Sequence, residues 1–202
     1  AAVRATQDFS SYISAIAHKR RSDAKEDLIS MLVHAVDAED GAKLSHDELV
    51  TTAILLLNAG HEATVHAISN GVKALLEHGN AQHRENCGSD AICEELLRFD
   101  APLHMFTRFA LEDCEFDGVQ FSRGETVGLL LGAANCDPQR FQRPHEFWPE
   151  RSDGSHVSFG GGIHFCIGAP LARMELKIAL PALVARLADL QITEVPRYAD
   201  RY

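Results

Sequence analysis

A single cysteine towards the C-terminal end of the chain stands in surroundings that favour chemistry. Residues 157–170 read VSFGGGIHFCIGAP, with Cys166 after a run of glycines and shortly before Pro170. Proline is common in the first turn of a helix, so the cysteine is expected directly ahead of one. Amide N–H groups in a glycine-rich turn and at a helix start point outward, and the helix dipole adds positive potential. Such a place stabilises a thiolate.

Three uses of Cys166 are open on these residues alone. A nucleophilic thiolate needs a base, and only His164 is close to it in the sequence. A metal-bound thiolate would have its donor strength tuned by N–H···S hydrogen bonds. A tight turn in which the cysteine only packs is the simplest alternative. A phosphate-binding loop is disfavoured, because the Gly-Lys-Ser or Gly-Lys-Thr that should follow the glycines is absent.

The composition argues against several classes of protein. At 202 residues, with 46% hydrophobic and 24% charged residues, the chain suits one large globular domain or two small ones. Its formal net charge of -10 argues against a nucleic-acid partner. The longest apolar runs, 53–57 and 127–134, are too short to span a bilayer, so no membrane partner is expected. The absence of a signal peptide and of an initial Met suggests a fragment.

The five cysteines are odd in number and contain no CxxC pair, which argues against a disulfide framework or a zinc cluster. A reducing cytoplasm is therefore the expected location. Apart from Cys166, the cysteines are expected to be small buried hydrophobes: Cys87, Cys93, Cys114 and Cys136.

The elements that must position Cys166 begin with helices. Apolar spacing predicts two helices over residues 9–41, separated by a polar, basic stretch. Ser45 and Glu48 form a capping-box pattern that predicts a long helix over about 46–77. Gly60 lies near its centre, where glycine costs roughly 1 kcal/mol relative to alanine. Its small size lets either a bulky group or a crossing helix approach the backbone closely.

A second, shorter helix is predicted over about 90–99, capped by Ser89 or Asp90. Glu95 and Arg98 are spaced to pair on its surface, which is the simplest interpretation of the two charges.

A β region is predicted over about 104–134, with a turn at Asp117–Gly118. A long, polar, Pro-rich coil leads from it to the cysteine loop at 157–169. The last helix is expected to start near Pro170, and Pro181 should end or kink it.

These residues carry a resemblance to a known family. FGGGIHFCIG at 159–168 is similar, at every specified position, to the haem-binding signature of cytochromes P450, F-G-x-G-x-[HR]-x-C-x-G. APLARMEL, directly after it, resembles that family's proximal helix. AGHE at 59–62 resembles the oxygen-binding stretch of its long central helix, and EELLR at 94–98 contains its ExxR motif. Residues 147–151 resemble the coil that supplies the arginine of a Glu–Arg–Arg core network.

The resemblance implies a fold that is mainly α with a small β region. It would be a truncated cytochrome P450 fold, the C-terminal haem-binding part, as a single domain over 1–202. The implied cofactor is haem b (iron protoporphyrin IX), with Cys166 as the metal ligand and Phe159 shielding its sulfur. The residues implied to contact the cofactor are Ala59, Gly60, Arg108, Phe159, His164, Cys166 and Gly168. The implied catalytic residues are Glu62 and Thr64.

The implied reaction is monooxygenation, in which one oxygen atom of O2 enters a small organic substrate and the other is reduced to water. The electrons would come from an electron-transfer partner of the ferredoxin or flavodoxin type. The alternative is a non-catalytic haem-binding or interaction module derived from such an enzyme.

Two departures from the family pattern bear on this function. Ala63 stands where threonine is usual, and the hydroxyl of Thr64 lies about 100° further round the helix. Proton delivery to bound oxygen is therefore expected to suffer. The chain is also roughly half the family's length, so a second chain or self-association is expected to cover the missing half. Without that cover, apolar residues such as Leu55 and Ile68 would be exposed.

Overall fold

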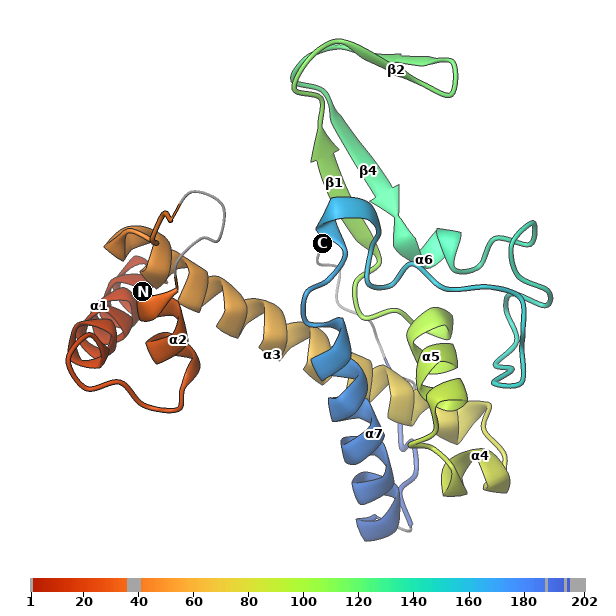
Figure 1. Ribbon diagram of the computed structural model, residues 1–202. Helices are drawn as coiled ribbons and strands as arrows, with labels where there is room; N and C mark the ends of the chain where they lie inside the picture. Colours follow the sequence, from red (N-terminus) through yellow and green to blue (C-terminus); the bar gives the residue numbers. More distant parts are fainter. Residues whose placement is uncertain (1, 36–40, 188, 195, 197–202) are drawn as a thin grey trace. The chain divides into compact units, whose positions relative to one another are not determined.

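The computed structural model of the chain describes residues 2–35, 41–187, 189–194 and 196. Its internal contacts divide it into two compact units, Ala1–Glu62 and Ala63–Tyr202. Helices dominate and strands are few (Figure 1), so the predicted fold class, mainly α with a small β region, is confirmed. The single domain expected over residues 1–202 stays a prediction.

The first unit contains two helices and the beginning of a third, as the apolar spacing predicts. They are α1 (Ala2–Arg20), α2 (Leu28–His34) and the first part of α3 (His46–Glu77). Asp27 caps α2 by accepting a hydrogen bond from the Ser30 amide at 2.8 Å, and its other oxygen accepts one from Arg20 Nε at 2.6 Å. The apolar side chains buried in this unit are Ile13, Ala17, Leu49 and Val50.

The long helix α3 begins where the capping box predicts. The Ser45 amide donates to the Glu48 carboxylate at 2.8 Å, and the Glu48 amide donates to the Ser45 hydroxyl at 3.2 Å. These bonds satisfy N–H groups that a helix start leaves unpaired. The helix runs for 32 residues to Glu77, which confirms the predicted span. It passes from the first unit into the second after Glu62.

The second unit packs its helices around an apolar core. These helices are α4 (Ala81–Glu85), α5 (Asp90–Phe99), α7 (Ala169–Arg186) and the rest of α3. Helix α7 runs beside α4 and α5 (Figure 1). The core side chains are Ala67, Ala74, Leu75, Cys87, Ile92, Cys93, Leu96, Leu97, Leu176 and Leu180. The predicted span of α5 is confirmed, and Ser89 is its N-cap, with the hydroxyl accepting from the Ile92 amide at 3.4 Å.

Helix α7 passes through Pro181 and continues to Arg186, so the proline does not end the helix, and the other expected outcome, a kink at Pro181, stays a prediction. Proline has no N–H, and the carbonyl of Lys177, four residues earlier, therefore loses its helical partner. That carbonyl lies against Gly88. A Cβ added to Gly88 would stand 2.8 Å from the Lys177 oxygen and 2.8 Å from Pro181 Cγ, so this contact requires glycine.

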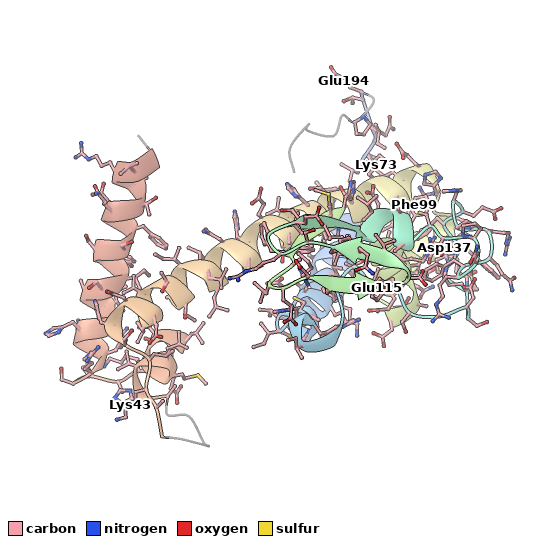
Figure 2. The ribbon with its side chains drawn as sticks, turned by 90° about the horizontal axis from the view of Figure 1, so that it is seen from above. Lys43, Lys73, Phe99, Glu115, Asp137 and Glu194 are labelled. Atoms are coloured by element: carbon pink, nitrogen blue, oxygen red, sulfur yellow. The ribbon has the colours of Figure 1, made fainter. Side chains whose placement is uncertain are left out.

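The β region consists of two antiparallel pairs. The first joins β1 (Met105–Phe109) to β4 (Thr126–Leu130), and the second joins β2 (Cys114–Phe116) to β3 (Val119–Phe121). Asp117 and Gly118 connect β2 to β3 with φ angles of 51° and 77°. Two positive φ values are what a tight hairpin turn needs, which confirms the predicted turn. Glu115 lies exposed on this hairpin (Figure 2).

The β region ends earlier than predicted. Residues 131–134 form the short helix α6 (Leu131–Ala134), because the chain turns inward there and buries Leu131. From residue 135 to 161 the chain forms neither helix nor strand, as its Pro-rich composition indicates.

Exposure of apolar residues on α3 follows the prediction only in part. Leu55 is exposed as expected, whereas Ile68 is half-buried because it packs against the core of the second unit. Among the described residues, no helix combines the length and the apolar character that crossing a bilayer requires.

Candidate functional site

The loop before α7 is shaped by backbone hydrogen bonds and by two glycines with left-handed backbone conformation. The Gly160 amide donates to the Val157 carbonyl at 2.8 Å, and the Cys166 amide donates to the Phe159 carbonyl at 2.9 Å. Gly160 and Gly162 have φ angles of 69° and 63°, a region that favours glycine. Cys166 lies just ahead of α7, as predicted.

One side of this loop is bare. A Cβ added at Gly161 or at Gly162 would meet no atom within 4 Å. Ile163 and Ile167 are 97% and 89% exposed, although both are large apolar side chains. Bare backbone beside exposed apolar side chains fits a flat, apolar ligand that lies against the loop.

Cys166 is the donor that this loop offers to a metal. It is half-buried and not in a disulfide. Its sulfur lies 3.8 Å from the place where a Cβ on Gly168, the N-cap of α7, would stand. In the parts of the chain that the structure describes, no three His, Cys, Asp or Glu side chains gather into a metal cluster. A single soft thiolate suits iron or another transition metal with ligands from outside the protein.

The other cysteines differ in their surroundings. Cys87 and Cys93 are buried as expected, and burial raises the pKa of both thiols, that of Cys93 to about 11. Cys114 is exposed on β2 and Cys136 is half-buried, which corrects the expectation of burial for these two. Both lie in irregular or edge regions where little of the second unit covers them.

A buried charge network holds the coil in front of the loop. Glu95 accepts from Arg98 Nε and Nη2, both at 2.8 Å, and from Arg151 Nε at 2.6 Å. The side chains of Glu95 and Arg98 are only 1% and 2% exposed. The predicted Glu–Arg–Arg network is therefore present, and a surface pair is ruled out.

Arg98 also organises the coil that follows α6. Its remaining N–H groups donate to three backbone carbonyls, those of Asn135 at 2.8 Å, Pro144 at 2.9 Å and Glu146 at 3.2 Å. All five guanidinium donors are thus used inside the protein. The Trp148 amide adds a bond to Glu95 at 2.8 Å.

Asn135 ties this coil to the cysteine loop. Its side chain accepts from the Val157 amide at 2.8 Å and donates to the Ser158 hydroxyl at 2.7 Å. Ser158 in turn donates to the Leu97 carbonyl on α5 at 2.7 Å. The start of the loop is therefore fixed to α5 through buried polar bonds, which positions Phe159 and Cys166.

Three further residues gather behind Phe159, and sequence reasoning missed them. Glu94 on α5 binds Arg173 on α7 and lies beside His156, and both partners contact the Phe159 ring. The three are separated by long stretches of sequence, so no local pattern links them. The one available signal is the place of Arg173 within APLARMEL.

The predicted residues on α3 lie on either side of the boundary between the two units. Ala59, Gly60 and Glu62 belong to the first unit and are exposed, and Gly60 faces open space where a Cβ would stand. Thr64 belongs to the second unit, and its hydroxyl donates to Glu175 on α7 at 3.0 Å. The hydroxyl next to Ala63 is therefore directed towards α7.

Arg108 and His164 are both exposed. Arg108 lies on β1 and its guanidinium donates to the Thr107 carbonyl at 2.9 Å. His164 ends the short 3-10 turn within the cysteine loop. Neither contacts Cys166 through a hydrogen bond described here, so their roles towards a cofactor remain predictions.

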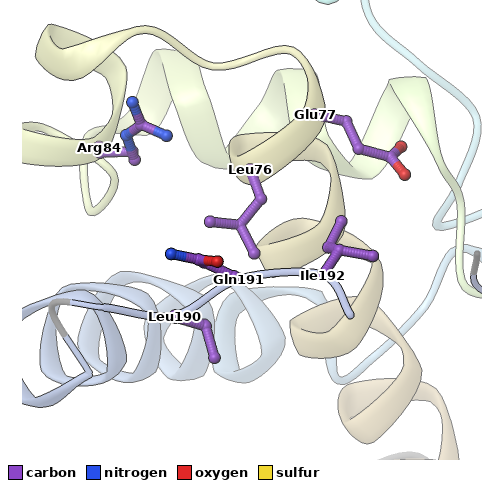
Figure 3. A pocket seen from close by; sticks show the side chains of 6 residues that line it. All are labelled: Leu76, Glu77, Arg84, Leu190, Gln191 and Ile192. Atoms are coloured by element: carbon purple, nitrogen blue, oxygen red, sulfur yellow. The ribbon is translucent and has the colours of Figure 1, made fainter. Parts of the chain in front are cut away.

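A pocket of about 460 Å³ is formed without any residue of the cysteine loop (Figure 3). It is lined by Leu76, Glu77, Arg84, Leu190, Gln191 and Ile192. None of the predicted site residues lines it, and we place the site at the cysteine loop because the donor atom is there.

Comparison with known proteins shows which family the chain resembles. A family profile described as Cytochrome P450 matches residues 1–85 and 89–192. The cytochrome P450 monooxygenase PikC of Streptomyces venezuelae is 42% identical over 196 residues, which cover 95% of this chain and 47% of the relative. The polyketide biosynthesis cytochrome P450 PksS of Bacillus subtilis (strain 168) is 42% identical over 197 residues, 96% of this chain and 48% of the relative. The chain thus spans about half the length of the curated relatives it matches.

Solved structures show the same relationship. The PksS structure from Bacillus subtilis 168 has a TM-score of 0.86 at 40% identity and covers 94% of this chain and 49% of that one. P450BioI, in complex with a hexadec-9Z-enoic acid ligated acyl carrier protein, has a TM-score of 0.85 at 41% identity, over 96% of this chain and 50% of that one. Because the profile extends over nearly all of the chain and the fold agrees with these structures, the chain belongs to the cytochrome P450 family.

Proposed function

We propose that this chain forms the haem-thiolate part of a P450 monooxygenase, with Cys166 as the ligand of iron in haem b. The family implies haem as the cofactor. The observation that carries the proposal is the cysteine loop itself. It presents one free cysteine sulfur beside bare glycine backbone and exposed Ile163 and Ile167, the surroundings that a flat porphyrin needs.

Haem with a thiolate ligand supplies an iron centre on which O–O cleavage is favoured. The chain's own residues would hold and orient it. Gly161 and Gly162 allow the macrocycle to approach the backbone, and Phe159, whose ring contacts that of Phe165, would shield the cysteine sulfur. Arg108 and His164 are exposed donors of a kind that suits the propionates. Ala59 and Gly60 would leave room on α3, and Glu62 and Thr64 would be the groups that move protons.

The substrate and partners of the whole protein belong to the same proposal. Names of the relatives refer to polyketide biosynthesis and to an acyl carrier protein bearing a fatty acid, which supports a small, largely apolar organic substrate. Electrons would come from a ferredoxin or flavodoxin type of protein. The chain spans about half of its relatives, so we propose that a second chain or self-association completes the fold. A free Cys166 suits the reducing cytoplasm.

A carbon monoxide spectrum tests the haem-thiolate assignment. Reconstituted with haem, reduced and treated with carbon monoxide, the chain should give the Soret band of thiolate-ligated ferrous haem. Cys166→Ser should abolish that band, whereas Cys136→Ser, at a half-buried cysteine in the same unit, should leave it unchanged. Loss of the band in Cys136→Ser and its persistence in Cys166→Ser would overturn the proposal.

The non-catalytic alternative is favoured by one observation. The residue at 63 has only a methyl group, and the neighbouring Thr64 hydroxyl is already bonded to Glu175. Ala63→Thr should therefore raise the product formed per electron consumed and lower the peroxide yield, because a hydroxyl can organise proton transfer. Absence of turnover in both parent and variant, with the thiolate spectrum intact, would identify the chain as a haem-binding module without oxygenase activity.

A further inference from the structure

Glu94 links α5 to α7 on the cysteine side of the second unit. Its two oxygens accept from the Arg173 guanidinium, Oε1 from Nε at 2.6 Å and Oε2 from Nη2 at 2.9 Å. A two-point pair of this kind fixes the plane of the guanidinium as well as its distance. Arg173 thus has one preferred orientation, which Glu94 sets.

His156 is the second partner of Glu94. Its side chain is 5% exposed, and its Nε2 lies 3.2 Å from Glu94 Oε2. Its Nδ1 accepts from the Ser158 amide at 3.2 Å, so in the neutral ring the proton is on Nε2, which lies near the carboxylate but makes no hydrogen bond of good geometry to it. We call Glu94, His156 and Arg173 the Glu94 cluster.

The Glu94 cluster surrounds the aromatic ring that adjoins the cysteine. Arg173 Cζ lies 4.6 Å from the Phe159 ring centre, and the His156 ring centre lies 5.9 Å from it. The Phe159 carbonyl accepts the Cys166 amide at 2.9 Å. The positive charge of Arg173 therefore lies over the residue whose carbonyl is bonded to the Cys166 amide, and the Glu94 carboxylate is paired with that charge.

We propose that Glu94 is a positioning residue that holds Arg173 over the Phe159 ring and cancels its charge, and so sets the electrostatic field at the sulfur of Cys166. The inference rests on the proposed function, because its effect is measured as the reduction potential of haem iron bound at Cys166. Glu94 and Arg173 together contribute no net charge behind the loop. Loss of the carboxylate leaves one positive charge there, and loss of the guanidinium leaves one negative charge.

The pKa values of Glu94 and Arg173 are shifted in the directions that keep both side chains charged. Burial opposes ionisation of Glu94, but its interactions with Arg173 and His156 outweigh it and lower the pKa of its carboxyl to about 2. Hydrogen bonding to Glu94, with smaller effects from the charges of Glu94, Asp90 and Cys166, raises the pKa of Arg173. The ion pair is therefore fully charged at neutral pH.

The test is the ferric/ferrous midpoint potential of the haem-loaded chain, measured by spectroelectrochemistry at neutral pH. Reduction adds negative charge to the iron site, so an uncancelled positive charge favours it. Glu94→Gln should raise the equilibrium constant for reduction about tenfold, which is about 59 mV for one electron. Arg173→Met should lower it by a similar factor, and the double variant should return close to the parent.

Asp90→Asn is the matched control. Asp90 pairs with Lys177 across the same two helices, with its side chain 80% exposed. Solvent screens so exposed a charge, so the potential of Asp90→Asn should shift far less than that of Glu94→Gln. Arg173→Lys serves as a second variant where Arg173→Met does not fold: it keeps the charge and loses the two-point geometry, and its potential should stay nearer to the parent than that of Glu94→Gln.

Opposite shifts for Glu94→Gln and Arg173→Met support the inference, because mere loosening of the loop would move both potentials in one direction. Equal potentials, shifts of the same sign, or a shift shared by Asp90→Asn would overturn it and leave the proposed function intact. A parent chain that forms no thiolate-type spectrum would overturn both.

Discussion

The Glu95 network and the cysteine loop are neighbours in the second unit, yet they differ in how complete they are. Every donor of Arg98 is used within the protein, and the network's carboxylate is 1% exposed. In the loop, by contrast, large apolar side chains face solvent and glycine backbone is uncovered. A region in which every polar group has a partner inside the protein serves to hold the fold together. A region that leaves apolar side chains and backbone uncovered is suited to binding a ligand.

The largest expected effect comes from breaking the network. Glu95→Ala removes the carboxylate that pairs with both Arg98 and Arg151, and it leaves the buried charge of Arg98 uncompensated. Urea unfolding should show a loss of about 3–5 kcal/mol. Glu146→Gln is the control, because the side chains of Glu146 and Arg143 form an exposed pair, and it should change stability little. Similar small losses in both variants would contradict a buried network.

The second-largest loss of stability is expected from a substitution at Gly88, where this glycine contacts α7. Gly88→Ala places a methyl group 2.8 Å from the Lys177 carbonyl, and backbone cannot move aside cheaply. The free energy of unfolding should fall by about 1–3 kcal/mol. Thermal or urea melts would measure it, and an unchanged midpoint would mean that Pro181 does not hold α7 against this glycine.

The ion pair of Glu94 and Arg173 should make a smaller, pH-dependent contribution to the free energy of unfolding. The pKa of Glu94 is about 2 in the folded chain against an ordinary value of 4.5, so the folded state binds the proton less readily. Its stabilisation is therefore present above about pH 4.5 and is lost as the pH falls towards 2. The difference in unfolding free energy between the parent and Glu94→Gln should shrink over that interval. A difference that is independent of pH would contradict the assigned pKa.

The smallest effect on stability is expected in the loop. Gly161 has an extended backbone, with φ of -162°, and no atom lies within 4 Å of an added Cβ. Gly161→Ala should therefore leave the unfolding midpoint of the haem-free chain unchanged while weakening haem retention, because the methyl group projects from the bare side. A stable variant with unaltered haem affinity would show that the ligand does not lie against this glycine.

Several features follow from local sequence alone. The capping box at Ser45 and Glu48, the Asp117–Gly118 turn and the bounds of α5 form as predicted. Each depends on residues a few positions apart, so local hydrogen bonding and allowed φ values are sufficient to specify it. The signature around Cys166 is of the same kind, since a short run of glycines and a helix start shape it.

Other features depend on residues that only folding brings together. The sequence led us to expect the β region to continue to 134, and burial of Leu131 decided otherwise. It left open whether Pro181 ends or kinks the last helix, and α7 continues through the proline, beside Gly88. The exposure of Cys114 and the half-burial of Ile68 were likewise set by which surfaces the second unit covers.

The sequence by itself determined the family signature and the order of the main helices and the β region, and it led to Cys166 as the proposed thiolate donor. Only the tertiary structure placed Glu94, His156 and Arg173 around Phe159 and directed the Thr64 hydroxyl to Glu175. The physical reason is distance along the chain: Thr64 and Glu175 are 111 positions apart, so no periodicity or spacing connects them. Their contact depends on how α3 and α7 pack around the shared apolar core.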